Sequence, residues 1–128
     1  MSYFVTGATG FIGRHLVERL LEREGDVNVL VREGSEDKLE RLVEGWGQPE
    51  RIKAVKGDLS QPGLGVSDED RERLKGVEHF FHLAAIYDMA ADDERNMKLN
   101  VGGTENAVDL ANALEAGTFH HALSLIHI

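Results

Sequence analysis

The sequence contains no cysteine, and its positive charge is scarce. Without cysteine, disulfide bonds, thiolate nucleophiles and cysteine-ligated metal centres are excluded from these 128 residues. Only 14 lysine and arginine residues stand against 23 aspartate and glutamate residues, which gives a net charge of −9. Proteins that bind nucleic acid or anionic membranes gather lysine and arginine, so this balance argues against both kinds of partner.

Long apolar runs, a targeting segment and a metal motif are missing as well. No run approaches the ~20 apolar residues that a membrane-spanning helix needs. The opening residues, MSYFVTG, lack the basic and apolar stretches of a signal peptide, so we expect a cytoplasmic protein. The histidines do not form a helical His-Glu-x-x-His motif, and several of them lie on strand-like patterns, so we expect no metal site.

Short apolar runs alternate with amphipathic segments, as in the βαβ units of a parallel sheet. This pattern predicts an α/β fold with helices on both faces of the sheet. In the first helix Ile12, Leu16, Val17, Leu20 and Leu21 form one apolar stripe, and Gly25 is placed to cap its end. Ser35 is placed to cap the second helix, and Ser67 with Asp70 resembles a capping box at the third. We predict strands at 3–6, 27–31, 51–55, 79–85 and 118–123, and helices at 11–24, 35–46, 67–75 and 92–116.

A glycine-rich turn, VTGATGFIG, joins the first strand to the first helix. Gly7 allows a sharp turn out of the strand, Gly10 has no side chain to keep a pyrophosphate from the backbone, and Gly13 lets the helix pack closely on the strand. The helix N-terminus offers free N–H groups and a partial positive charge to the phosphates. A lone glycine triplet is weak evidence, but its place between a strand and an amphipathic helix favours a dinucleotide site over a ligand-free turn.

The segment TGATGFIGRHLVERLL resembles the start of an extended short-chain dehydrogenase/reductase. Similar landmarks follow in order: VREGS, GDL, HLAA and NVGGTENAVDLA. The segments GDLSQPGLGVSDED and VEHFFHLAAIYDM are most similar to the thioester- and fatty-acyl-reductase branch. The resemblance covers residues 1 to 121 and implies an NAD(P)-binding domain with a Rossmann-type doubly wound parallel sheet, here ending after about five strands. It also implies that the whole turn, with Ala8, Thr9, Phe11 and Ile12, contacts the cofactor.

The residues after the second strand bear on the choice between NADP and NAD. Arg32 suits a 2′-phosphate because its planar guanidinium can hold the dianion, and Ser35 can donate a further hydrogen bond. If the strand instead ends one residue later, Glu33 would accept from the ribose 2′-hydroxyl of NAD. We expect NADP, with NAD as the alternative.

Other candidate cofactor residues follow the third and fourth strands. Asp58 can accept a hydrogen bond from the adenine amino group, with Leu59 packed on the ring, although an Asp here can equally serve an Asx turn. The small residues of Leu83-Ala84-Ala85 would let the nicotinamide half pass over the sheet, or belong to the core. In the family that the sequence resembles, an Asn at the place of Asn100 helps to hold the loop after the fourth strand; here it can also be an exposed helical Asn.

The catalytic pair of this family is missing. Its members use a Tyr with a Lys four residues later, whereas here Tyr3 is followed by Gly7 and Tyr87 by Ala91, so no catalytic residue is assigned. The tail at 122–128 does not match the Ser-rich loop of the family, and we expect a truncated sequence whose last residues are not native. Such a chain should be inactive and fold poorly alone.

For the complete protein we expect an oxidoreductase that reduces an acyl thioester or carbonyl of a small-molecule substrate, with a homodimer as its expected assembly. The alternatives are a nucleotide-sugar epimerase or dehydratase, and a sensor that binds NADP without chemistry. A Tyr-x-x-x-Lys motif further along the gene would favour either enzyme, and its absence would favour the sensor.

Overall fold

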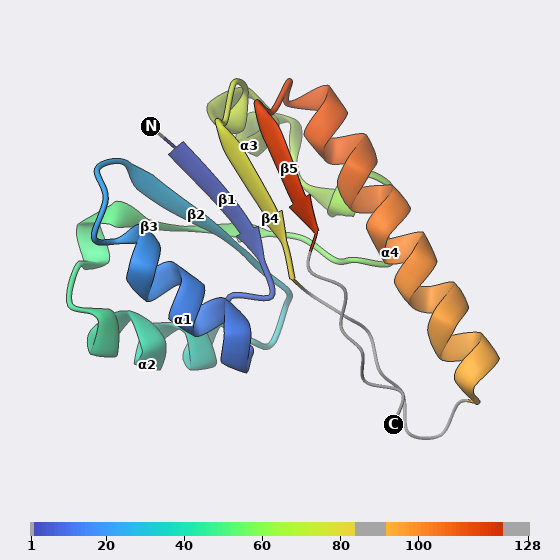
Figure 1. The fold of residues 1–128 in the computed structure, drawn as a ribbon, viewed down its shortest axis with the longest axis horizontal. Helices are drawn as coiled ribbons and strands as arrows, with labels where there is room; N and C mark the ends of the chain where they lie inside the picture. The colour runs from blue at the N-terminus through green and yellow to red at the C-terminus, as the bar shows by residue number, and fades with distance from the viewer. Residues whose placement is uncertain (1, 84–91, 122–128) are drawn as a thin grey trace.

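The computed structural model describes residues 2–83 and 92–121, and within them five strands form one parallel sheet (Figure 1). The strand order is β3-β2-β1-β4-β5, so the chain starts in the middle, runs to one edge and then crosses to the other. This arrangement confirms the predicted α/β doubly wound sheet. The strands are β1 Ser2–Thr6, β2 Asp26–Val31, β3 Ile52–Lys56, β4 His79–His82 and β5 Thr118–His121.

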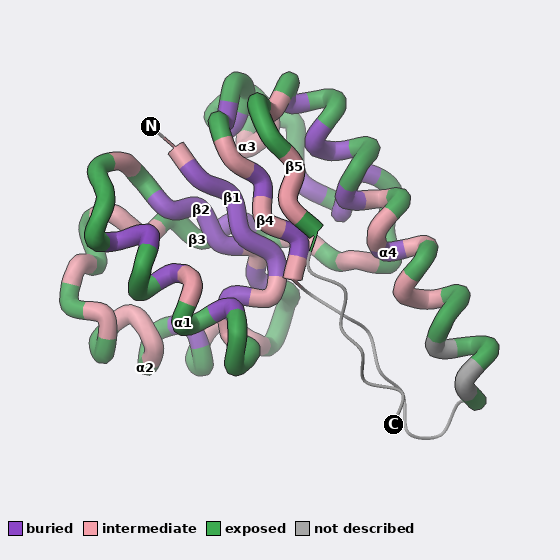
Figure 2. Tube along the Cα trace, in the orientation of Figure 1, coloured by how far each residue is buried: buried purple, intermediate pink, exposed green. Residues whose placement is uncertain are grey.

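Two apolar cores lie on opposite faces of the sheet, because successive side chains of a strand point to opposite sides. Tyr3 and Val5 pack with α1 and α2 on one face, and Phe4 packs with α3 and α4 on the other (Figure 2). Both faces are covered, as a parallel sheet requires. The helices are α1 Phe11–Leu20, α2 Glu36–Trp46, α3 Asp68–Leu74 and α4 Asp93–Ala113, and the short 3₁₀ turns are η1 Pro49–Arg51 and η2 Pro62–Gly65.

The first helix begins at Phe11, as predicted, but ends earlier than predicted. It stops at Leu20 rather than at residue 24, and its C-cap is Leu21, so the prediction that Gly25 caps it is wrong. The backbone carbonyls of Leu21 and Gly25 instead accept hydrogen bonds from the Arg51 guanidinium. The apolar stripe predicts a buried Ile12, but this residue, in the first turn of the helix, is 65% exposed.

The N-termini of the other helices are capped in different ways. The Ser67 hydroxyl accepts from the Asp70 N–H at 3.2 Å, which confirms the predicted cap of α3. Ser35 occupies the N-cap position of α2, but its hydroxyl makes no capping bond. There the Glu36 carboxylate accepts from the Gly34 N–H at 2.9 Å, so the predicted side-chain cap by Ser35 is wrong.

Strand β4 ends at His82, three residues earlier than predicted, and Leu83 follows it directly. Ala84, Ala85 and Tyr87 lie outside the described residues, as does the tail at 122–128. Among the helices described, none combines the length and the apolar character that crossing a bilayer would require.

Candidate functional site

The carboxyl ends of four neighbouring strands bring the predicted site residues to one end of the sheet, here called the carboxyl edge. Gly7 follows β1, Arg32 follows β2, Asp58 follows β3 by two residues and Leu83 follows β4. Because the strands lie in the order β3-β2-β1-β4, these residues follow one another across the sheet in the spatial order Asp58, Arg32, Gly7 and Leu83. The chain leaves β1 toward β2 and crosses back from β3 to β4 on the other side of β1, so a topological switch point lies between β1 and β4, beside the glycine turn. Doubly wound sheets bind their ligands at such a point.

The three glycines of the turn have distinct environments. Gly7 has a φ of 81°, a left-handed conformation that suits glycine, and its carbonyl accepts from the Gly10 N–H at 3.1 Å. A Cβ built on Gly13 would lie 1.8 Å from the Gly7 oxygen, so the helix can pack here only without a side chain. A Cβ on Gly10 would stay 3.4 Å from its nearest neighbour, and Gly10 is exposed. The absence of a side chain at Gly10 therefore leaves the solvent-facing side of the turn accessible to a ligand.

The N-terminus of α1 is open toward the same side of the turn. No side chain caps this helix, and its first turn contains no acidic residue. Its first N–H groups therefore have no intrahelical partner and carry the positive end of the helix dipole. Phe11 and Ile12 in the same turn are 69% and 65% exposed, and the Arg14 guanidinium lies 5.6 Å from the centre of the Phe11 ring. A phosphate group fits this set of donors and charges.

Arg32 and Asp58 interact electrostatically across the ends of β2 and β3. The Asp58 Oδ1 accepts from the Ser60 N–H at 2.9 Å and from the Ser60 hydroxyl at 2.8 Å, which is an Asx turn. These two hydrogen bonds lower the pKa of Asp58, and the positive charge of Arg32 lowers it further. Arg32 is exposed. The edge therefore presents a carboxylate beside an arginine with an accessible guanidinium.

Two further predicted site residues, Leu59 and Asn100, lie in the loop after β3 and in helix α4. Leu59 is half-buried, and its carbonyl accepts from the Asn106 side-chain amide at 2.8 Å. Asn100 is also half-buried, on the eighth residue of α4. Asn106 is not among the residues predicted from sequence, because nothing in the spacing of a helical Asn reveals that it faces a loop 47 residues away.

A buried histidine that the sequence does not single out lies beneath this edge. His82 is 2% exposed, and its Nδ1 lies 2.7 Å from the Thr6 Oγ1. Its Nε2 lies 3.4 Å from the Thr104 Oγ1. The Thr6 Oγ1 also accepts from the Leu83 N–H at 3.2 Å. Burial lowers the pKa of His82 to about 4, with a smaller contribution from His121, so His82 is neutral at pH 7.

The histidines of β4 pair with those of β5 across the two strands. The His79 Nδ1 lies 3.2 Å from the His120 Nε2, and the His82 and His121 rings are 5.2 Å apart. In the part of the chain that the structure describes, no group of three acidic or histidine side chains could hold a metal ion.

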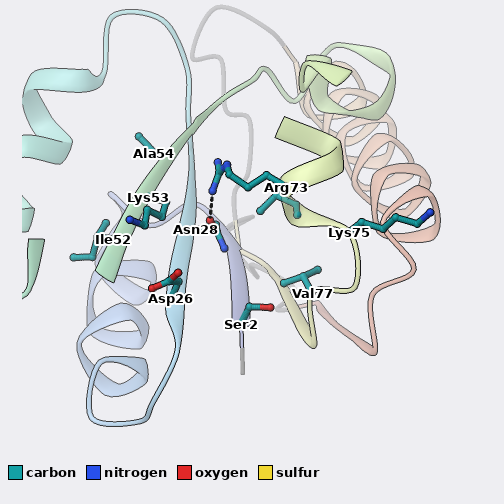
Figure 3. Close-up of a pocket in the computed structure, with 10 residues that line it drawn as sticks. Ser2, Asp26, Asn28, Ile52, Lys53, Ala54, Arg73, Lys75 and Val77 are labelled. Carbon is teal, nitrogen blue, oxygen red and sulfur yellow. Dashed lines mark hydrogen bonds between the residues drawn. The ribbon is translucent and has the colours of Figure 1, made fainter. Parts of the chain in front are cut away.

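A hollow of about 480 Å³ lies at the opposite edge, near the amino ends of β1, β2 and β3 (Figure 3). Arg73 reaches into it from α3 and donates from Nη1 to the Asn28 Oδ1 at 2.9 Å, while the Asn28 amide donates to the Tyr3 carbonyl at 3.0 Å. Lys75 points away from this contact. The hollow is far from the glycine turn along the strands, and the Arg73 guanidinium within it is already bonded to Asn28.

Residues 5–125 match the family described as male sterility protein, an NAD-binding family. The chain belongs to this family. It is 37% identical over 127 residues to a linear gramicidin synthase protein of Brevibacillus parabrevis, in an alignment that covers 91% of this chain and 2% of that protein. It is 29% identical over 128 residues to fatty acyl-CoA reductase wat of Drosophila melanogaster, in an alignment that covers 87% of this chain and 25% of that protein.

Solved structures show the same fold. The terminal R domain of the myxalamid PKS-NRPS pathway matches with a TM-score of 0.75 at 27% identity, over 94% of this chain and 33% of that one. Gre2 of Candida albicans, solved in complex with NADPH, matches with a TM-score of 0.73 at 26% identity, over 92% and 34%. The chain is thus a nicotinamide-dinucleotide-binding segment of the extended short-chain dehydrogenase/reductase type. It spans about a third of the length of these structures.

Proposed function

We propose that this chain forms the cofactor-binding part of an NADP-dependent reductase that acts on an acyl thioester or carbonyl substrate. The match to the male sterility protein family over residues 5–125 carries the proposal. The relatives named above include a fatty acyl-CoA reductase and a gramicidin synthase protein, and one structural neighbour was solved with NADPH. The geometry of the carboxyl edge supports a bound dinucleotide.

Each part of the dinucleotide has a proposed partner in this chain. The open N-terminus of α1 would bind the pyrophosphate over Gly10, and the Arg32 guanidinium would bind the 2′-phosphate with help from the Ser35 hydroxyl, which makes no capping bond. Asp58 would accept from the adenine amino group beside Leu59. Leu83 would lie under the nicotinamide half of the cofactor. The bound cofactor would supply hydride to the substrate.

Proton transfer to the substrate oxygen needs a general acid that this chain does not supply. Neither Tyr3 nor Tyr87 is followed by a Lys at the fourth residue, and Tyr3 is 1% exposed within the core. We propose that residues beyond these 128 supply the acid and the substrate pocket. Reaction assays therefore require the full-length protein that contains this chain.

The test is consumption of NADPH by that full-length protein in the presence of a long-chain acyl-CoA thioester. We expect NADPH oxidation that depends on the thioester, followed by absorbance at 340 nm, with release of free CoA. Turnover of a nucleotide sugar without net consumption of cofactor would instead identify an epimerase. NADPH binding without turnover of any such substrate would identify a sensor.

Replacement of Arg32 by Asp tests the proposed preference for NADP. We expect NADPH affinity to fall at least tenfold, because a charge-assisted contact to the 2′-phosphate is lost and a repulsive carboxylate takes its place. NADH affinity should change much less. Fluorescence titration with both cofactors measures the ratio, and Arg41→Asp on exposed α2 is the matched control. Equal weakening of both cofactors would show that Arg32 does not contact the 2′-phosphate.

A further inference from the structure

The loop between β3 and α3, from Gly57 to Val66, is fixed by contacts within itself. The Asp58 N–H donates to the Leu64 carbonyl at 2.7 Å, and the Gln61 N–H donates to the Asp58 carbonyl at 3.1 Å. Leu64 is fully buried with a φ of 61°, a conformation that a branched side chain keeps only where its surroundings hold it. The loop therefore behaves as one rigid piece that carries Asp58 and Leu59.

Helix α4 anchors this rigid loop to the rest of the molecule. The Asn106 side-chain amide donates to the Leu59 carbonyl at 2.8 Å. One turn earlier, Gly103 faces the same residue, because a Cβ built on Gly103 would lie at an ordinary contact distance of 3.6 Å from the Leu59 Cβ. The hydrogen bond fixes the backbone next to Asp58, so the position of the Asp58 carboxylate depends on α4.

The same turn of α4 also contacts the end of β4. Thr104 lies between Gly103 and Asn106, and its hydroxyl lies 3.4 Å from the His82 Nε2. The other nitrogen of His82 lies 2.7 Å from the hydroxyl of Thr6, the residue that precedes the glycine turn. One helical turn therefore connects the loop that carries Asp58 with the strand that leads into the glycine turn.

We infer that Asn106 is a positioning residue that holds Asp58 at the distance from the glycine turn that the adenine end of the dinucleotide requires. This inference rests on the proposed function. Oδ1 of Asp58 is occupied by Ser60, whereas Oδ2 has no hydrogen bond to any described residue and is available to the adenine amino group. Hydrogen bonds weaken steeply with poor geometry, so a shifted loop would lose this contact while the pyrophosphate contacts remain.

The test replaces Asn106 by Asp in the full-length protein. Aspartate has the same size, but it places an acceptor against the Leu59 carbonyl and removes the donor. Asn112→Asp makes the same change at an exposed position of α4 and is the matched control. The probes are NADPH and its hypoxanthine analogue, in which oxygen replaces the adenine amino group. The readout is the ratio of the two dissociation constants, which a general loss of stability would not change.

The wild-type protein should bind NADPH about tenfold more tightly than the analogue, the effect of one charge-assisted hydrogen bond. In Asn106→Asp this ratio should fall close to one, and in Asn112→Asp it should be retained. An unchanged ratio in Asn106→Asp, or a wild-type protein that does not distinguish the two probes, would overturn the inference. If circular dichroism shows that Asn106→Asp does not fold, the same ratio in Asn106→Ser decides, since serine is too short to reach the Leu59 carbonyl. A wild-type protein that binds neither probe would instead refute the proposed function.

Discussion

At the scale of single residues, two glycines of the turn have different roles, one in packing and one in the proposed cofactor binding. Gly13 serves packing, because any side chain there would overlap the Gly7 backbone at 1.8 Å. Gly10 has an ordinary φ of −80°, and a Cβ there would lie 3.4 Å from its nearest neighbour, so neither backbone strain nor a clash requires glycine at that position. Under the proposed function, the close approach of the pyrophosphate to the backbone is what requires glycine at Gly10.

Substitution at these two glycines should separate binding from folding. Gly10→Val should abolish binding of NADPH and NADH while the thermal unfolding midpoint changes little, because the branched side chain fills the space of the pyrophosphate. Gly13→Ala should lower the free energy of unfolding by several kcal/mol, since overlap with backbone forces the helix to move. Thermal unfolding by circular dichroism and fluorescence titration measure the two effects. Retained cofactor affinity in folded Gly10→Val would remove the pyrophosphate site from this turn.

The sequence is informative about the glycines and less so about single side chains. The separate jobs of Gly7 and Gly13 follow from their place between a strand and a helix, and the structure agrees with both. Ile12 has the spacing of a buried residue but is exposed in the first turn of α1, which periodicity alone does not reveal. Asn106 and His82 act through contacts across 47 and 76 residues, and no local pattern carries such information.

At the scale of elements, the order of strands and helices follows from apolar periodicity, but their ends do not. Helix α1 keeps good helix formers, Glu22, Arg23 and Glu24, beyond its last residue, so local propensity predicts a longer helix. The structure ends it at Leu20. Arg51, from the turn before β3, donates to carbonyls in this segment, and such a tertiary contact outweighs a few tenths of a kcal/mol of propensity.

Replacement of Arg51 by Lys should therefore destabilise the junction between α1 and β2. The guanidinium bonds the carbonyls of Leu21, Arg23 and Gly25 and the Gln48 side chain, whereas an ammonium group cannot reach all four acceptors. We expect the free energy of unfolding to fall by about 1–3 kcal/mol in urea titrations. Arg19→Lys, on the exposed side of α1, is the control and should change it little. A loss no larger than that of the control would show that Arg51 does not hold this junction.

At the scale of the whole molecule, His82 ties the two halves of the sheet to the helix on one face. It lies on β4, contacts Thr6 of the neighbouring strand β1 and contacts Thr104 of α4. The position is 2% exposed, so a charge on the ring would have to be accommodated away from water. Protonation of His82 should therefore act on the fold as a whole rather than on one element.

The last prediction concerns the dependence of stability on pH. Burial, with a smaller contribution from His121, lowers the pKa of His82 to about 4, whereas an unfolded chain binds the proton near the usual value of 6.5. Between these values the unfolded state holds more protons than the folded state, so the free energy of unfolding should fall as the pH drops from 6.5 toward 4 and level off above 6.5. The pKa of Asp58 is also lowered, so its contribution to the free energy of unfolding is lost only at pH values below its usual pKa of 3.8. The effect of Asp58 can therefore be separated from that of His82.

Urea unfolding at several pH values between 7 and 4 measures this slope, and His82→Gln should reduce it because glutamine does not titrate. The variant should also be less stable than the wild type at pH 7, since glutamine does not reproduce both ring contacts. His15→Gln is the control, because that side chain is 61% exposed on α1, and it should keep the wild-type slope. A slope that persists unchanged in His82→Gln would place the acid sensitivity elsewhere, and His82 would then be a packing residue without influence on the pH dependence of the fold.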